Sequence, residues 1–248
     1  MTSHGASLGS SPRPKLVRVA KASELDRAFE TLGVSGPRPV LVSVGGASGM
    51  EPEQLTAIGG LVRDHVLPVV ERYGAAVVDG GTDSGVMRVF GEARAATGGS
   101  FPLIGVAAAG TVALSGQPAV ATAALDRRHT GVVLVPGDTW GSESPWLAKV
   151  ATRLAGGKPS VTLVIDGGSI TYDDVANSLA CRRPVLVVAG SGRTADAIAG
   201  MAEDSGDARD RRARRIVDPA LVRVTQLGDA TGIAAALDEF LGAGAEAK

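Results

Sequence analysis

Cysteine is almost absent from this chain. Cys181 is the only one among 248 residues, so the chain cannot form an internal disulfide bond. Such a composition is typical of proteins that fold in a reducing compartment. We therefore expect a cytoplasmic protein without a disulfide framework.

Long apolar runs and a strong net charge are also missing. No apolar run reaches the roughly 20 residues that cross a bilayer, and the polar opening segment lacks the apolar core of a signal peptide. The net charge of −1 gives no electrostatic attraction to nucleic acid. Histidine and cysteine do not occur at metal-ligand spacing. The sequence thus predicts no membrane span, no nucleic-acid partner, no metal site and no cofactor.

Aromatic residues are scarce as well. They make up 3% of the chain, whereas apolar residues reach 44% and glycine occurs 34 times. A core of Val, Ala, Leu and Ile is the usual content of a parallel sheet buried between helices. Because short strand-like segments alternate repeatedly with helical patterns, we expect an α/β fold with a doubly wound, mostly parallel, Rossmann-like sheet and helices on both faces.

Hydrophobic periodicity places the individual elements. We expect strands at residues 16–19, 39–44, 75–78, 103–106, 132–135, 161–165, 185–188 and 221–224. Helices are expected at residues 24–32, after Ser23 as N-cap, at 51–73, with a kink or split at Pro68, and at 84–96, 145–154, 172–179, from Arg193 to 201, and at 232–241. Residues 1–14 are expected to form a disordered tail, and residues 15–248 a single domain.

Four glycine-rich turns follow strands in this scheme, at residues 45–49, 80–85, 136–143 and 190–196. Parallel strands present their carboxyl ends at one edge of the sheet, where doubly wound folds bind ligands. Backbone N–H groups and the positive ends of helices make such turns suitable for phosphate. For each turn taken alone, a purely conformational need for glycine is the alternative.

Side chains in these turns add further possibilities. Trp140 could stack on a planar base, and Glu143 is the candidate catalytic residue, although it could instead complement the helix dipole or bond ribose hydroxyls. Arg193 starts a helix, where its charge opposes the dipole, so we expect it to bind an anion. The candidate ligand-binding residues are Gly45, Gly46, Ala47, Gly80, Gly81, Thr82, Ser84, Gly85, Val86, Met87, Gly137, Asp138, Thr139, Trp140, Gly141, Ser142, Glu143, Gly190, Ser191, Gly192, Arg193 and Thr194.

Four other features are less specific. Arg88 could reach back to an anion or lie exposed on its helix, and His129 is interpreted as a hydrogen-bonded structural group rather than a base. The Gly- and Ala-rich segment 107–125 could form part of a pocket or a lid. The charged run 204–215 is expected to be an exposed loop or a ragged helix.

Three motifs together resemble a known family. They are Gly80-Gly81-Thr82-x-Ser84-Gly85-Val86-Met87, Leu125-Asp126-x-x-His129-Thr130 and Gly190-Ser191-Gly192-Arg193-x-Ala195-Asp196. In this order they resemble the SLOG superfamily of Rossmannoid domains, most closely its LSDAT group, which includes the N-terminal cytoplasmic domain of TRPM cation channels. The likeness extends from about Val17 to the last helix.

The resemblance implies a domain that binds or senses a nucleotide-derived ligand, such as an ADP-ribose-like molecule or a cyclic nucleotide. Residues 80–87 and 190–194 would then hold phosphates and ribose, and residues 137–143 would complete the site. The resemblance also implies a homo-oligomer. The signal that ligand is bound would then pass to an effector protein or to another copy of the chain.

The enzymatic branch of the same superfamily provides the alternative function. Its phosphoribohydrolases carry a Pro-Gly-Gly-x-Gly-Thr-x-x-Glu loop and a Met-His-x-Arg-Lys element. Here Asp138 replaces the second glycine, the loop is one residue shorter up to Glu143, and the second element is absent. Cleavage of a nucleotide N-glycosidic bond, with Glu143 as acid or base, is therefore the second hypothesis, and an interaction scaffold with a vestigial pocket is the third.

Overall fold

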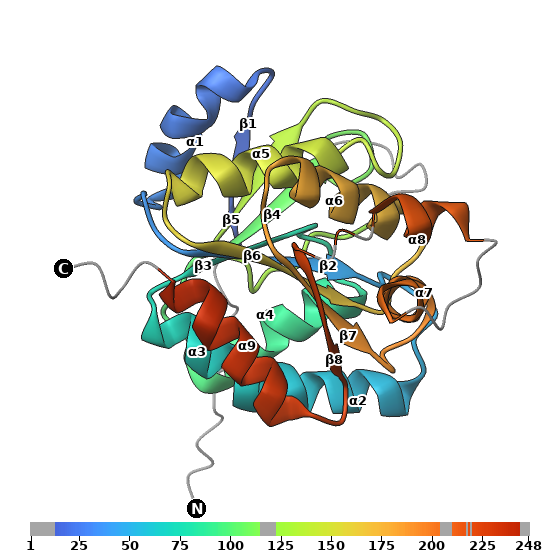
Figure 1. Cartoon of the computed structure of the whole chain (residues 1–248). Helices are drawn as coiled ribbons and strands as arrows, with labels where there is room; N and C mark the ends of the chain where they lie inside the picture. Colours follow the sequence, from blue (N-terminus) through green and yellow to red (C-terminus); the bar gives the residue numbers. More distant parts are fainter. Residues whose placement is uncertain (1–12, 115–122, 204–209, 217, 219, 244–248) are drawn as a thin grey trace, which may run out of the picture.

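One parallel sheet organises the molecule. The structure is a computed structural model that describes residues 13–114, 123–203, 210–216, 218 and 220–243 (Figure 1). Within these residues, eight strands form a sheet in the order β1-β5-β4-β3-β2-β6-β7-β8, and every neighbouring pair is parallel. The tail expected at residues 1–14 lies, apart from its last two residues, outside the described residues.

The strands agree with the expected ones, with ends shifted by at most two residues. They are β1 (Lys15–Arg18), β2 (Val40–Gly45), β3 (Ala76–Asp79), β4 (Leu103–Ala108), β5 (Gly131–Val135), β6 (Ser160–Ile165), β7 (Val185–Ala189) and β8 (Val222–Gln226).

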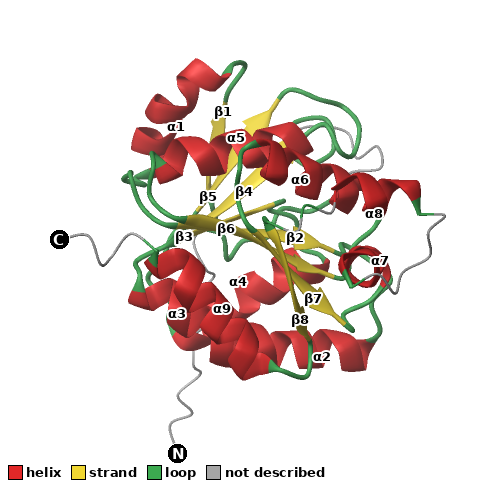
Figure 2. Ribbon diagram, viewed as in Figure 1, coloured by secondary structure: helices red, strands yellow, loops and turns green. Residues whose placement is uncertain are grey.

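Helices cover both faces of the sheet, as Figure 2 shows. The helical segments are α1 (Leu25–Leu32), α2 (Pro52–Leu61), the π-helical η2 (Val62–Val66), α3 (Leu67–Arg72), α4 (Gly85–Thr97), α5 (Ser144–Ala155), α6 (Ser169–Ala180), α7 (Arg193–Ala202), α8 (Arg211–Ile216) and α9 (Ala230–Gly242). Buried residues of α1, α5, α6, α7 and α8 share one apolar cluster, and those of α2, η2, α3, α4 and α9 share the other. The doubly wound α/β fold expected from the sequence is therefore confirmed.

Strand β2 shows why the central strands carry no polar face. Val40, Val42 and Val44 point into the cluster that contains α5, whereas Leu41 points into the opposite cluster with α2 and α4. Successive side chains of a strand alternate between the faces, and both faces here are covered by helices. Residues 40–44 are therefore all buried and are apolar except for Ser43.

The order of the strands reverses between β2 and β6, which pair along six residues. The chain leaves β2 through α2 toward β3 on one side, and it leaves β6 through α6 toward β7 on the other. In open α/β sheets, the crevice outside the carboxyl ends of two such strands is the usual place for a ligand. The topology therefore points to this edge of the sheet.

The helices differ from expectation in two places. Ser23 is not the N-cap of α1: it lies in a short 3-10 turn (Ala22–Glu24), and Glu24 caps the helix. The Glu24 carboxylate accepts the Ala20 N–H at 2.7 Å, which holds the chain in this tighter turn. The long helix expected at residues 51–73 is split near Pro68, one of the two expected effects of this residue: the π-helical turn η2 separates α2 from α3, and Pro68 lies in the first turn of α3.

The second difference concerns α6, which begins at Ser169 rather than near Tyr172. The charged run 204–215 is helical in α8, and its residues 204–209 lie outside the described residues. Across the described part of the chain, no helix combines the length and apolarity that crossing a membrane requires.

Candidate functional site

A cavity opens at the carboxyl edge of the sheet, at the reversal between β2 and β6. The cavity has a volume of about 230 Å³. Residues from the ends of six strands or the segments that follow them line it: Ser43, Val44, Gly45, Ala47, Ser48, Gly80, Thr82, Met87, Ala107, Thr111, Trp140, Glu143, Leu147, Gly168, Ser169, Ile170, Thr171, Asp174 and Arg193. The four expected glycine turns thus each contribute to one cavity.

The candidate residues divide into those that line the cavity and those that lie behind it. The first group consists of Gly45, Ala47, Gly80, Thr82, Met87, Trp140, Glu143 and Arg193. The second consists of Gly46, Gly81, Ser84, Gly85, Val86, Gly137, Asp138, Thr139, Gly141, Ser142, Gly190, Ser191, Gly192 and Thr194. The contacts of the second group show that many of these residues shape the turns.

Close backbone packing joins the first two turns. A Cβ on Gly45 would overlap the carbonyl oxygen of Ile165, and one on Gly85 would overlap that of Gly46. Gly85 also has φ of +50°, and the Val86 N–H donates to the Gly46 carbonyl at 3.0 Å. Glycine is therefore required here for close approach between main chains, independently of any ligand.

The third turn is closed by its own side chains. The hydroxyls of Thr139 and Ser142 lie 3.0 Å apart, and Gly137, at φ of +142°, leaves no room for a Cβ beside Ser142. The Gly141 N–H donates to both oxygens of Glu143, at 3.1 and 3.0 Å. Trp140 is 49% exposed on the cavity wall, so its indole face is open to a planar group.

Arg193 reaches the cavity through an ion pair. Its Nε donates to Asp166 at 2.8 Å, its Nη2 donates to the second Asp166 oxygen, and Nη2 also donates to the Ser48 carbonyl at 2.7 Å. Asp166 is buried, whereas the Arg193 side chain is 45% exposed. Both residues have positive φ, 56° and 37°, which is rare for residues with a side chain and marks a constrained site.

The remainder of the fourth turn holds this arrangement together. The Ser191 hydroxyl accepts the Asp166 N–H at 2.8 Å and donates to the Val188 carbonyl. The Thr194 hydroxyl donates to the Gly168 carbonyl at 2.9 Å. These side chains fix the starts of α6 and α7 against each other.

Two carboxyl groups, those of Glu143 and Asp174, face the same cavity as Arg193. Burial raises the pKa of Glu143 above its ordinary value, although the Gly141 N–H opposes this effect. Burial also raises the pKa of Asp174, to about 7, and the nearby charges of Glu143 and Asp173 act in the same direction. The cavity therefore combines a guanidinium with two carboxyl groups that ionise reluctantly.

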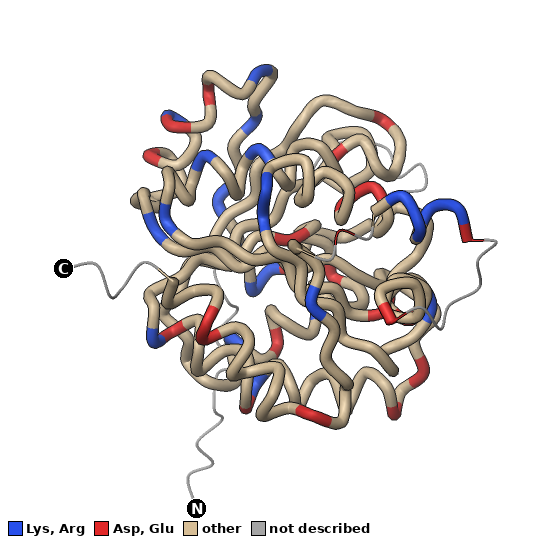
Figure 3. The backbone as a smooth tube through the Cα atoms, in the orientation of Figure 1, with Lys and Arg blue, Asp and Glu red and all other residues tan. Residues whose placement is uncertain are grey.

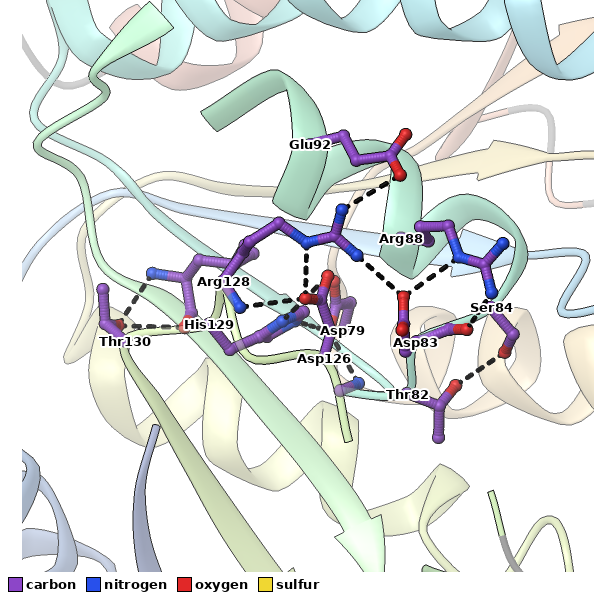
Figure 4. A network of polar contacts seen from close by, with 12 residues as sticks. Asp79, Thr82, Asp83, Ser84, Arg88, Glu92, Asp126, Arg128, His129 and Thr130 are labelled. Carbon is purple, nitrogen blue, oxygen red and sulfur yellow. Dashed lines mark hydrogen bonds and ion pairs between the residues drawn. The ribbon is translucent and has the colours of Figure 1, made fainter. Parts of the chain in front are cut away.

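A buried network supports the second turn from behind (Figure 4). The His129 ring lies between two fully buried carboxylates, with Nε2 at 2.8 Å from Asp79 and Nδ1 at 3.7 Å from Asp126. Burial opposes protonation, but the two carboxylates outweigh it and raise the pKa of His129 to about 9. Asp79 also accepts the Gly81 N–H at 2.7 Å, so the charged histidine helps to hold the turn.

Arg128 and Arg88 extend this network toward the surface. Arg128 Nε donates to Asp126 at 2.7 Å, and its Nη2 donates to Asp83 at 2.7 Å. Arg88 Nε donates to the same oxygen of Asp83 at 3.0 Å. Arg88 is thus paired on the outside of α4 and does not line the cavity.

Surface charge gives no second site of comparable definition. Figure 3 shows acidic and basic residues interspersed, with a visibly basic stretch on α8. Arg212 of that helix pairs with Asp173 at 2.9 Å and lies over the Tyr172 ring. Within the described ranges, no group of three or more His, Cys, Asp or Glu side chains is placed to hold a metal ion.

Sequence reasoning missed Asp166 and Asp174 as partners in the site. Asp166 directly precedes Gly167-Gly168 at the end of β6, and that strand-to-glycine junction was a usable signal. Asp174 lies one turn inside α6, where a single aspartate in a helix carries no signal of its own. The partners of His129 were likewise missed: Asp79 is 50 residues away in sequence, whereas Asp126, three residues before His129, was a usable signal.

Comparison with known proteins agrees with this fold. The family model described as "SLOG in TRPM, prokaryote" (LSDAT_prok) matches residues 38–235. Transient receptor potential cation channel subfamily M member 2 is 27% identical over 229 residues in Mus musculus and 28% identical over 207 residues in Rattus norvegicus. These matches cover 76% and 68% of this chain, but 15% and 14% of the respective relatives. The chain belongs to the family of SLOG domains found in TRPM proteins, and it matches that family's prokaryotic model.

Proposed function

We propose that the cavity binds a nucleotide-derived ligand, such as an ADP-ribose-like molecule or a cyclic nucleotide, and that the protein acts as a sensor of it. The observation that carries this proposal is the position of the cavity at the β2/β6 reversal. There α4, α5, α6 and α7 begin beside one another, each after a strand end that contributes to the lining. Helix N-termini and Arg193 favour a phosphate, and exposed Trp140 offers a stacking surface for a base.

Arg193 is the one cationic side chain among the cavity-lining residues that the structure describes. Asp166 orients its guanidinium, and its Nη1 makes no hydrogen bond within the described part of the chain. A phosphate could accept a hydrogen bond from Arg193 Nη1 without breaking the ion pair between Arg193 and Asp166. Arginine suits such an arrangement because its planar fork serves two anionic partners at once.

Replacing Arg193 by alanine is expected to weaken binding of AMP and of ADP-ribose by about 10- to 100-fold, equivalent to about 1.5–3 kcal/mol for a charged hydrogen bond. Isothermal titration calorimetry of both nucleotides, and of a cyclic dinucleotide, measures the effect. Arg88→Ala is the matched control, because Arg88 pairs with Asp83 outside the cavity.

Two outcomes of that titration, and one of a further experiment, have different meanings. Unchanged affinity in Arg193→Ala contradicts the anchoring role of Arg193. Failure of the unaltered protein to bind any nucleotide of the panel contradicts the sensor proposal and leaves the scaffold alternative. A change of oligomeric state or of protein partners on nucleotide binding, seen by size-exclusion chromatography and pull-down, would identify how the bound state is read.

Burial of Glu143 in the cavity favours a second candidate, hydrolysis of a nucleotide N-glycosidic bond. Glu143 would accept a proton from water as the water oxygen bonds to C1′, and the base would leave with the electron pair of the broken C1′–N bond and take up a proton. Its raised pKa suits proton transfer near neutral pH.

Incubation with AMP, followed by chromatography for free adenine, tests the hydrolysis candidate. We expect adenine release, if it occurs, to disappear in Glu143→Ala and to persist in Glu53→Ala, which alters an exposed carboxylate on α2. Binding of AMP without adenine release excludes hydrolysis of AMP and supports the sensor function.

A further inference from the structure

Asp174 is an unusual group to find in a site for an anionic ligand. Its side chain lies on the cavity side of α6, one turn after the helix start, and the residue is only 8% exposed. Its Oδ1 is buried and has no hydrogen-bond partner within the described residues. A buried, unsatisfied carboxyl oxygen destabilises a fold, so its presence at a cavity wall calls for a partner that the protein alone does not supply.

The start of α5 lies beside Asp174. Ser144, the first residue of α5, is close enough to Asp174 to oppose the rise of its pKa. The Ser144 hydroxyl in turn accepts from Asn177 Nδ2 at 3.1 Å. Ser144 and Asn177 thus link the start of α5 to α6 beside Asp174, while Asp174 Oδ1 keeps no hydrogen-bond partner among the described residues.

Glu143 brings a second carboxyl group to the same wall. It is held by the Gly141 N–H through both of its oxygens, and it is close enough to Asp174 to raise the pKa of that group. Two carboxyl groups repel phosphate, which Arg193 and the helix starts attract instead. Neighbouring carboxyl oxygens are well suited to accept hydrogen bonds from the adjacent hydroxyls of a sugar.

We infer that Asp174, together with Glu143, forms the subsite that recognises the vicinal hydroxyl groups of the ligand's ribose. This inference rests on the proposed function and assigns a different part of the ligand to each side of the cavity. Arg193 and the helix starts take the phosphate, and the carboxyl pair distinguishes a ribonucleotide from a deoxyribonucleotide. Asp174 is the residue that sets this preference.

The test compares AMP with 2′-deoxy-AMP, because the two share a base and a phosphate and differ in one hydroxyl. We expect the unaltered protein to bind AMP about tenfold more tightly, the scale of one hydrogen bond to a charged group. In Asp174→Ala the preference should fall to about twofold or less, while affinity for 2′-deoxy-AMP stays within about threefold of the unaltered protein. Isothermal titration calorimetry measures all four affinities.

Arg193→Ala is the control, since it should weaken both nucleotides by a similar factor and leave the preference intact. Asp174→Asn covers the case in which Asp174→Ala does not fold, because asparagine has nearly the same shape as aspartate but no negative charge. We expect the preference of this variant for AMP over 2′-deoxy-AMP to be at least threefold smaller than that of the unaltered protein. A preference that survives in the folded Asp174 variant overturns the inference alone. Absence of AMP binding to the unaltered protein, when ADP-ribose or the cyclic dinucleotide still binds, also overturns the inference alone. Absence of binding to every nucleotide of the panel overturns the inference and the sensor proposal together.

Discussion

Replacing His129 by leucine is expected to lower the free energy of unfolding by about 3–5 kcal/mol, the usual loss when one member of a buried ion pair is removed. The Asp79 and Asp126 side chains are fully buried on either side of the ring. Leucine has a similar volume, so packing is largely kept while two carboxylates lose their shared cation. Chemical denaturation at pH 6 measures the change.

The contribution of His129 also depends on pH in a defined direction. Its pKa is 6.5 in the unfolded chain and about 9 in the folded protein. A raised pKa means that the folded state binds the proton more tightly, so the stabilisation is complete below pH 6.5 and disappears as pH rises to about 9. The shift corresponds to about 3 kcal/mol, which the unaltered protein should lose across this window.

The control for His129 is His65→Leu, which alters a half-buried histidine on η2 outside the network. We expect this variant to keep the loss of stability between pH 6.5 and 9, and His129→Leu to lack it. Equal pH profiles for His129→Leu and the unaltered protein would show that the ring is not charged between its two carboxylates.

Replacing Asp174 by asparagine is expected to have the opposite effect and to raise the free energy of unfolding at pH 8 by about 2–4 kcal/mol. The pKa of Asp174 rises from 3.8 to about 7 on folding, mainly because burial disfavours the charged form. The contribution of Asp174 to stability is therefore fully present below pH 3.8 and is lost as the pH rises to about 7. Above that pH, the folded protein holds a buried charge at Asp174. Asparagine has nearly the same shape and never carries that charge.

The pH profile distinguishes this effect from a general gain in packing. Asp174→Asn and the unaltered protein should have similar stability near pH 4 and diverge toward pH 8, as followed by thermal unfolding. Asp173→Asn is the matched control, because the Asp173 side chain is 63% exposed. We expect this variant to change the free energy of unfolding by no more than about 0.5 kcal/mol. A variant that is less stable than the unaltered protein at pH 8 contradicts the prediction. Stabilisation by removing a binding group is a common trade-off at functional sites.

Much of the fold follows from local pattern. Apolar runs such as those of β2 and β6 indicate strands buried on both faces, and the helices between them require parallel connections. Pro68 predicts a kink or split in its helix, because proline has no backbone N–H to donate to the helical hydrogen-bond pattern. Helix starts are harder to predict: the tight turn before α1 depends on the Glu24 side chain reaching Ala20, a contact that periodicity does not contain.

The cavity was predictable at the level of turns but not of individual contacts. The strand-to-glycine junctions identify the edge of the sheet, and all four turns reach the cavity. Glycine itself does not reveal whether it faces a ligand or another main chain, so Gly46 and Gly85 were assigned to binding although they pack against each other. Asp166 and Asp174 acquire their roles only through tertiary proximity to Arg193 and Glu143, which no local spacing encodes.

The contact between the first two glycine turns has a practical consequence for engineering. The Val86 N–H donates to the Gly46 carbonyl, and neither Gly45 nor Gly85 leaves room for a side chain. The two segments therefore pack together as one unit. Grafting a loop from a homologue into either segment alone would push against the other. Libraries that aim to change specificity should therefore exchange both segments as a unit, or leave them untouched and vary the walls formed by Trp140, Ile170 and Asp174.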